Sequence, residues 1–290
     1  MYRHWIHRRT AWRCLAVTVS ALLFACGPAL AAPPAIDWDE APTGLEQQAL
    51  TDTNFVWHTL RGEAVRVHYR PGSFAARHAV MLMRSADASV RRAIEIVGIE
   101  HYERPVDVFF FDTRADLIDF VGVPATGYAD WESSSVFLVF SPTWRAFDTH
   151  EIAHVVSINT WGVPAEPIWW IREGLSVYVD GRCREHTVQA LAAEYLRRGE
   201  LPHASDLIYR FANVGELPGY LGSGSFVGFL YETYGVEAVH RIWQQGGDAI
   251  ETVTGASLDG IDARWRAWLE SIASDVEPEE WRRVIDDGCG

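Results

Sequence analysis

The chain has 290 residues, a formal net charge of −14 and no lysine, so all 25 of its basic residues are arginine. A protein this acidic is a poor partner for nucleic acid, because its own charge repels the phosphates. Hydrophobic residues make up 48% of the chain and include 13 tryptophans, which excludes a disordered protein and indicates an ordered core.

Residues 1–31 have the pattern of a signal peptide. Arginines come first, an apolar stretch of about a dozen residues follows from Cys14 to Ala25, and Ala29-Leu30-Ala31 fits a cleavage site. This stretch is too short for a comfortable membrane span, and no later segment approaches 18 apolar residues. We therefore predict an exported protein, periplasmic, envelope-associated or secreted, with no transmembrane span in the mature chain.

The cysteines are consistent with export. Cys26 follows Leu23-Phe24-Ala25, which resembles a bacterial lipobox with an ill-fitting phenylalanine, so a lipid anchor at Cys26 and a soluble protein both stay open. Cys183 and Cys289 form an even pair in an oxidising compartment, where a disulfide between them would tie down the C-terminus. Two unpaired thiols are the alternative.

Residues 32–55 are acidic and rich in proline and alanine, and we interpret them as a linker or a loosely docked arm. Residues 56–145 predict a small α/β lobe. Its predicted strands are 64–70, 105–111 and 135–140, and its predicted helices run from the cap Ser73 to Val97 and from 112 or 113 to 120. If the edge of the strand at 135–140 is free, an extended peptide substrate can pair with it.

Residues 146–290 predict a helical lobe. Its first helix contains His150-Glu151-Ile152-Ala153-His154, and its second starts near Pro167 and contains Glu173. Further helices are predicted at about 186–198, 222–234, 236–245 and 259–273.

The first two of these helices are predicted to supply the ligands of one Zn²⁺ ion. Histidines at i and i+4 lie about 40° apart on one helix face, so His150 and His154 can reach the same ion. Catalytic zinc sites usually have three protein ligands and one open position, and Glu173 completes such a set. Glu151 is placed to hold the attacking water as general base. The alternatives are a helix that carries two histidines without a metal, and Glu166 in place of Glu173.

These residues resemble the gluzincin zinc metallopeptidases, within them the aminopeptidase-N-like group of the peptidase MA-like superfamily and its short bacterial, exported members. The family pattern HExxH-x18-E matches His150 to Glu173, and its Trp-Leu-Asn-Glu-Gly-Phe-Ala-x-Tyr is similar to Trp170–Tyr178. The segment from Tyr220 to Gly235 resembles the family's tyrosine, glycine-containing turn and helix. The resemblance implies a thermolysin-like catalytic unit, with Tyr220 donating a hydrogen bond to the oxyanion.

The chain also departs from this family. We find neither the Gly-x-Met-Glu-Asn segment that holds a substrate's free amino terminus nor the large N-terminal β-domain, so aminopeptidase specificity does not follow. The aspartate that thermolysin has four residues after its glutamate ligand is Val177 here. A carboxylate that orients a histidine ligand would come from elsewhere, with Asp148 and Asp180 as candidates.

Several side chains near the motif have two interpretations. Arg172 either contacts a substrate carboxylate or carries a solvent-facing charge. Tyr220 is either the oxyanion donor or an aromatic side chain packed in the core. Trp161, Trp169 and Trp170 either line a substrate cleft or belong to the core.

We therefore predict an α+β fold in which a small N-terminal α/β lobe precedes a mostly helical C-terminal lobe, with the zinc site at the joint. The predicted activity is zinc-dependent hydrolysis of peptide bonds in a peptide or protein substrate, with Glu151 as general base. Two alternatives stay open, namely a catalytically silent zinc-containing module of the cell envelope and a zinc hydrolase that acts on other bonds.

Overall fold

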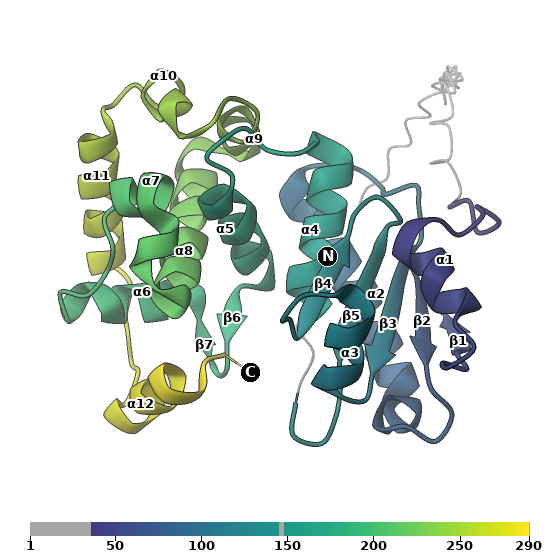
Figure 1. Ribbon diagram of the computed structural model, residues 1–290. Coiled ribbons are helices and arrows are strands. Elements are labelled where there is room, and N and C mark those ends of the chain that lie inside the picture. The colour runs from purple at the N-terminus through teal and green to yellow at the C-terminus, as the bar shows by residue number, and fades with distance from the viewer. Residues whose placement is uncertain (1–35, 145–147, 290) are drawn as a thin grey trace, which may run out of the picture. The chain divides into compact units, whose positions relative to one another are not determined.

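A five-stranded mixed sheet occupies the first part of the described chain. The computed structural model describes residues 36–144 and 148–289, so the predicted signal peptide and Cys26 lie outside the described residues. The strands are β1 (His58–Arg61), β2 (Val65–Tyr69), β3 (Val106–Phe111), β4 (Gly127–Asp130) and β5 (Ser135–Val139) (Figure 1). Their order is β1-β2-β3-β5-β4; β2, β3 and β5 are parallel, and β1 and β4 are antiparallel to their neighbours.

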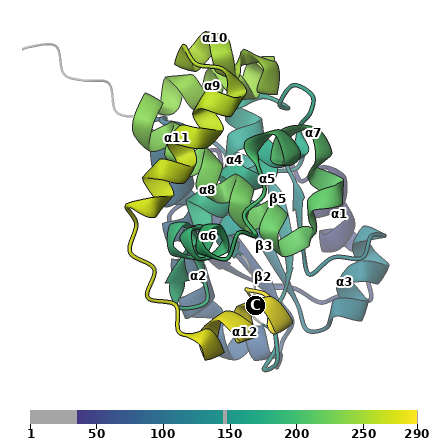
Figure 2. The same ribbon diagram turned by 90° about the vertical axis from the view of Figure 1, so that its left-hand side faces the viewer.

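Helices cover both faces of this sheet. α2 (Phe74–Val97) and α4 (Asp148–Trp161) lie on one face, and α1 (Gly44–Thr51) and α3 (Arg114–Val121) on the other (Figure 1, Figure 2). β3 is buried at all six positions, which explains why its sequence is nearly continuously apolar. Ser73 caps α2 as predicted, since its hydroxyl accepts a hydrogen bond from the backbone N–H of Ala76 at 2.9 Å.

Two details of the predicted α/β lobe differ in the structure. Residues 44–51 of the predicted linker form α1, whose Ala49 is buried in a cluster with Phe109 and Phe111. The strand predicted at 135–140 is β5, which has β3 on one side and β4 on the other. The hypothesis that β5 offers a free edge to substrate is therefore wrong, because β4 is the edge strand on this side of the sheet.

A buried polar cluster ties α1 to the sheet. Arg66 donates hydrogen bonds to both carboxylate oxygens of Asp107, at 2.7 and 2.6 Å, and to Glu46 of α1 at 3.0 Å. His68 is hydrogen-bonded to the same Asp107 at 2.7 Å. Burial and the nearby Asp107 raise the pKa of Glu46 to about 7, although Arg66 acts to lower it.

This cluster predicts that the protein loses stability as the pH rises from about 4.5 to 7. The pKa of Glu46 is about 7 in the folded state, and its ordinary value is 4.5. The stability that protonated Glu46 contributes to the fold is therefore fully present below pH 4.5 and is lost as the pH rises through 7. Relative to Glu46→Gln, the free energy of unfolding of the wild type should fall by on the order of 1–3 kcal/mol. Urea unfolding of the metal-free protein across this range measures it, with Glu63→Gln, which removes an exposed carboxylate, as control. If the difference in the free energy of unfolding between the wild type and Glu46→Gln does not change with pH, the prediction is contradicted.

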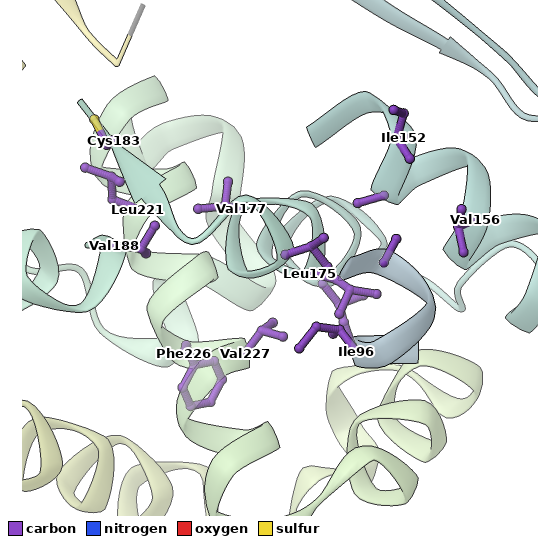
Figure 3. Packing of buried hydrophobic residues seen from close by; sticks show 14 of the residues in the cluster. Ile96, Ile152, Val156, Leu175, Val177, Cys183, Val188, Leu221, Phe226 and Val227 are labelled. Atoms are coloured by element: carbon purple, nitrogen blue, oxygen red, sulfur yellow. The ribbon is translucent and has the colours of Figure 1, made fainter. Parts of the chain in front are cut away.

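The chain beyond α4 is mostly helical. Its helices are α5 (Trp169–Asp180), α6 (Val188–Arg197), α7 (Ala204–Val214), α8 (Glu216–Tyr234), α9 (Val236–Gln245), η1 (Gly247–Ala249), α10 (Ile250–Thr254), α11 (Leu258–Glu270) and α12 (Pro278–Asp287). A short hairpin, β6 (Arg182–Cys183) and β7 (His186–Thr187), follows α5. One cluster of buried apolar side chains runs through both parts of the fold and includes Ile96 of α2, Ile152 of α4, Leu175 of α5 and Val227 of α8 (Figure 3).

Glycines bring α5 and α8 close together. A Cβ atom on Gly174 of α5 would lie 2.7 Å from the backbone oxygen of Ser223, and one on Gly224 of α8 would overlap Val177. The sequence suggested a glycine-containing turn before a helix at 222–234, but α8 already begins at Glu216 and includes these glycines. Helical glycine is tolerated here because the close contact between the helices requires it.

Cys183 and Cys289 form the predicted disulfide, which links β6 to the chain after α12 across a sequence separation of 106 residues. Cys183 is buried, with 1% of its surface exposed. Close by, Nε2 of His186 in β7 lies 3.1 Å from Oε2 of Glu280 in α12. Among the described residues, no helix is both long and apolar enough to cross a membrane.

Candidate metal centre

The structure brings His150, His154 and Glu173 together, although they come from two helices. The Nε2 atoms of the two histidines are 3.1 Å apart, and each lies 3.2 Å from Oε2 of Glu173. In the part of the chain that the structure describes, these three residues make up the group of potential metal ligands, and Glu166 is not part of it. His154 and Glu173 are buried, and His150 is partly buried.

The spacing of these three atoms fits a zinc ion. Ligands about 2.0–2.1 Å from a tetrahedral zinc ion lie roughly 3.3–3.4 Å from one another. The observed separations of 3.1 and 3.2 Å are close to that value. Two imidazole nitrogens and one carboxylate oxygen are also a donor set that catalytic zinc sites use. The residues therefore fit Zn²⁺ bound by one oxygen of Glu173.

Electrostatics favour an ionised Glu173 beside the histidines. Burial acts to raise the pKa of Glu173, but the charges of His154 and His150 and their hydrogen bonds hold it well below its usual range. Burial acts to lower the pKa of His150, but the bond to Glu173 and the negative charge of Glu151 raise it instead. A carboxylate that stays charged in a buried site is suited to binding a cation.

Glu151 lies next to this centre, under the edge strand of the sheet. Burial raises the pKa of its carboxyl group, while His150 and His154 act to lower it. Its side chain lies against Gly127 of β4, where an added Cβ atom would be 2.6 Å from Oε1 of Glu151. The missing side chain at position 127 therefore leaves the room that this carboxylate occupies.

This contact predicts that Gly127→Ala lowers catalysis more than stability. The three atoms nearest to the new methyl group all belong to the Glu151 side chain, with Oε1 at 2.6 Å, Cγ at 3.0 Å and Cδ at 3.1 Å, so this side chain must turn away while the backbone can stay in place. If Glu151 is the general base that the sequence predicts, kcat is expected to fall at least about 10-fold, because a misplaced base transfers protons poorly. Zinc content and thermal unfolding should change little. Gly260→Ala on α11, where the nearest atom is 3.3 Å away, is the matched control, and an unchanged kcat for Gly127→Ala would contradict the prediction.

Tyr220 lies beside the ligands, on α8 rather than in a turn. Its ring centroid is 6.1 Å from that of His150, and it is 5.8 Å from that of Phe211. Burial, and then the charge of Glu173, raise the pKa of the Tyr220 hydroxyl, which therefore stays protonated and able to donate a hydrogen bond.

The two carboxylates considered as supports for a histidine make no hydrogen bond to one in the described structure. Burial raises the pKa of Asp180 to about 6, with the nearby His150 acting to lower it and Asp148 to raise it. Instead, the hydroxyl of Ser176 lies 3.0 Å from Nδ1 of His154. No sequence signal singles out Ser176, because a serine on a helix is common and its partner is set by packing.

Arg172 and the three tryptophans are also placed by the structure. Arg172 is not a solvent-facing charge. Its guanidinium donates two hydrogen bonds to Oε1 of Glu173, from Nε at 3.2 Å and from Nη2 at 3.0 Å. Trp170 is fully buried, and Trp161 packs against His240 and Trp243, so both belong to the core. Trp169 is 53% exposed and lies under Arg172, with 4.5 Å from the guanidinium carbon to the ring centroid.

Comparisons with known proteins add little to this geometry. No protein-family model matches the chain, and no curated protein matches its sequence. One similar solved structure is a two-domain M1 zinc metallopeptidase, a variant bound to L-arginine, with 14% identity, a TM-score of 0.42, and coverage of 75% of this chain and 52% of that one. Another is an aminopeptidase N family protein from Idiomarina loihiensis, with 10% identity, a TM-score of 0.33, and coverage of 79% and 46%. The chain thus spans about half the length of each.

Proposed function

We propose that the protein is a zinc-dependent peptide-bond hydrolase that acts outside the cytoplasm. The observation that carries the proposal is the convergence of His150, His154 and Glu173 at 3.1–3.2 Å, with Glu151 adjacent to the first ligand in sequence. Three ligands from two helices leave one side of the centre for water and substrate. A histidine pair that is merely part of a helix surface would not need a buried glutamate oxygen 3.2 Å from both of its Nε2 atoms.

A bound zinc ion would supply Lewis-acid chemistry, which polarises a carbonyl group and makes water more acidic. Glu151 accepts the proton of the attacking water and passes it to the nitrogen of the leaving amine. Its raised pKa suits a group that must both take up and release a proton. The protonated hydroxyl of Tyr220 donates a hydrogen bond to the substrate oxygen that gains negative charge, a contact that can contribute about 3 kcal/mol.

The edge strand β4 supports a peptide as the substrate. β4 lies at the end of the strand order, and no described strand pairs with it on the side opposite β5. Its first residue, Gly127, is in contact range of Glu151. An extended peptide that adds to this edge would hydrogen-bond through its main chain and bring a peptide bond toward the general base. This assignment replaces the one that the sequence suggested for β5.

An extracytoplasmic site of action is supported by the signal-peptide pattern of residues 1–31 and by the Cys183–Cys289 disulfide. Disulfides of this kind persist in oxidising compartments. A lipid anchor at Cys26 would place the enzyme on the envelope, and that residue lies outside the described part of the chain.

The test is cleavage of a peptide library by the mature protein, with and without a chelator, together with the measured zinc content. We expect about one zinc ion per chain and cleavage that the chelator abolishes and added zinc restores. Zinc without cleavage of any peptide would favour a silent envelope module. Zinc together with hydrolysis of an amide or epoxide compound but of no peptide would identify a non-peptide hydrolase. A chain that binds no zinc would overturn the proposal.

A further inference from the structure

Helix α5 carries two side chains that bond the candidate metal ligands through atoms other than those that meet at the ion position. Arg172 donates two hydrogen bonds to Oε1 of Glu173, the oxygen that does not face the histidines. Ser176 bonds Nδ1 of His154, the ring nitrogen that does not face the metal position. Both contacts therefore act on the far side of a ligand.

The contact of Arg172 fixes which oxygen of Glu173 is available. With Oε1 held by Nε and Nη2, Oε2 is left to meet both histidines at 3.2 Å. Arg172 itself is held, because its guanidinium stacks on Trp169 and its side chain is only 17% exposed. A planar guanidinium fixed in this way restricts rotation of the carboxylate and favours binding through one oxygen.

The contact of Ser176 fixes the orientation of His154 and offers an acceptor to the Nδ1 proton of its metal-binding tautomer. Ser176 is fully buried, and Nδ1 of His154 lies 3.0 Å from its hydroxyl oxygen. An Nδ1–H that donates to this oxygen leaves the lone pair on Nε2, which is the form that binds a metal ion. Without the hydroxyl, the imidazole could rotate or place its proton on Nε2.

Both supports follow from the position of Glu173 on one helix. Arg172 precedes this ligand directly, and Ser176 follows it by three residues, which places Ser176 on the same face of α5. We propose that Arg172 and Ser176 are positioning residues that hold Glu173 and His154 in the metal-binding geometry before the ion arrives. The inference rests on the proposed function in taking the centre as a zinc site, and its first readout is the affinity for the metal.

The experiment measures the zinc dissociation constant of the full mature chain by competition with a chromophoric chelator. Arg172→Met keeps the length of the side chain and removes its donors, and Ser176→Ala removes the hydroxyl. Loss of such a support typically weakens metal binding about 10- to 100-fold, and we expect an increase of this size for each variant. The absorption spectrum of the cobalt-substituted protein should also change, because it reports the arrangement of the ligands.

Two contacts far from the metal centre supply matched controls. Arg198 donates to Glu194 at 2.7 Å and lies over Trp281 at 4.7 Å, so Arg198→Met removes the same kind of arginine–carboxylate–indole contact. Ser225 is a fully buried serine that accepts a hydrogen bond from the indole N–H of Trp265, so Ser225→Ala removes the same kind of hydroxyl. Both controls should keep the wild-type zinc affinity. If Ser176→Ala fails to fold, the nearly isosteric Ser176→Cys takes its place.

The outcomes separate this inference from the proposed function. If the wild type binds no zinc, the proposed function fails. If the wild type binds zinc and folded Arg172→Met and Ser176→Ala bind it equally well, only the positioning roles fail. Arg172→Met could instead keep the wild-type zinc affinity and raise KM only for peptides that carry a carboxylate. That result would assign Arg172 to substrate binding. At saturating zinc, positioning predicts a lower kcat with little change in KM.

Discussion

Glu151→Gln is expected to retain its zinc and to lose about 100- to 10,000-fold in kcat, the contribution that a positioned general base commonly makes. The amide has nearly the same shape as the carboxylate, so it keeps the packing against Gly127. The amide cannot accept a proton from water. Zinc should stay bound because Glu151 makes no hydrogen bond to His150, His154 or Glu173 in the described structure. The measurement is kcat for the best library peptide at saturating zinc, together with the zinc content of the variant.

Glu216→Gln is the matched control for this prediction. Glu216 lies in the first turn of α8, the helix that carries Tyr220, and it is exposed to solvent. It should keep wild-type turnover, because a solvated carboxylate at this place holds no reacting group. A Glu151→Gln protein with full zinc and undiminished hydrolysis would remove Glu151 from the mechanism, and the proton acceptor would have to be sought elsewhere.

Cys289→Ser is expected to lower the free energy of unfolding by about 2–5 kcal/mol. The disulfide closes a loop of more than 100 residues, since the two cysteines are 106 positions apart, and long loops give the largest stabilisation in the chain-entropy account. Substituting Cys289 is preferable to substituting Cys183, because the buried position of Cys183 would then hold an extra hydroxyl group. Urea unfolding of the purified mature protein measures the change.

Treatment of the wild type with a reductant supplies the control for Cys289→Ser. The reduced wild type should become about as unstable as the variant, and the variant should not respond to the reductant. The remaining contacts between these segments, such as the salt bridge of His186 with Glu280, persist in both proteins. Equal unfolding free energies for the oxidised wild type and the variant would show that the crosslink does not stabilise the fold.

The elements that the sequence predicted well are those with strong periodic signals. Ser73 and Gly98 mark the ends of α2 (Phe74–Val97), and Gly235 and Gly246 mark the ends of α9 (Val236–Gln245). The elements that were not predicted are short or have no such residue at their start. β1 and β4 have four residues each, and α7 begins after His203 with no side-chain cap.

The ligands of the candidate metal centre could be predicted, but their supports could not. His150, His154 and Glu173 follow from helical periodicity and the chemistry of zinc, which are properties of local sequence. The roles of Arg172 and Ser176 depend on side-chain directions that only the packed helices fix. The edge position of β4 likewise depends on strand order, which a run of apolar residues such as Val136–Val139 does not encode.

The glycines between α5 and α8 make the position of the ligand-bearing helix depend on two residues that have no side chain. A Cβ atom on Gly174 would lie 2.7 Å from the backbone oxygen of Ser223, and one on Gly224 would overlap the side chain of Val177. The same contact makes Gly174 and Gly224 positions where sequence drift should be strongly restricted, because even a methyl group would force the ligand-bearing helix outward.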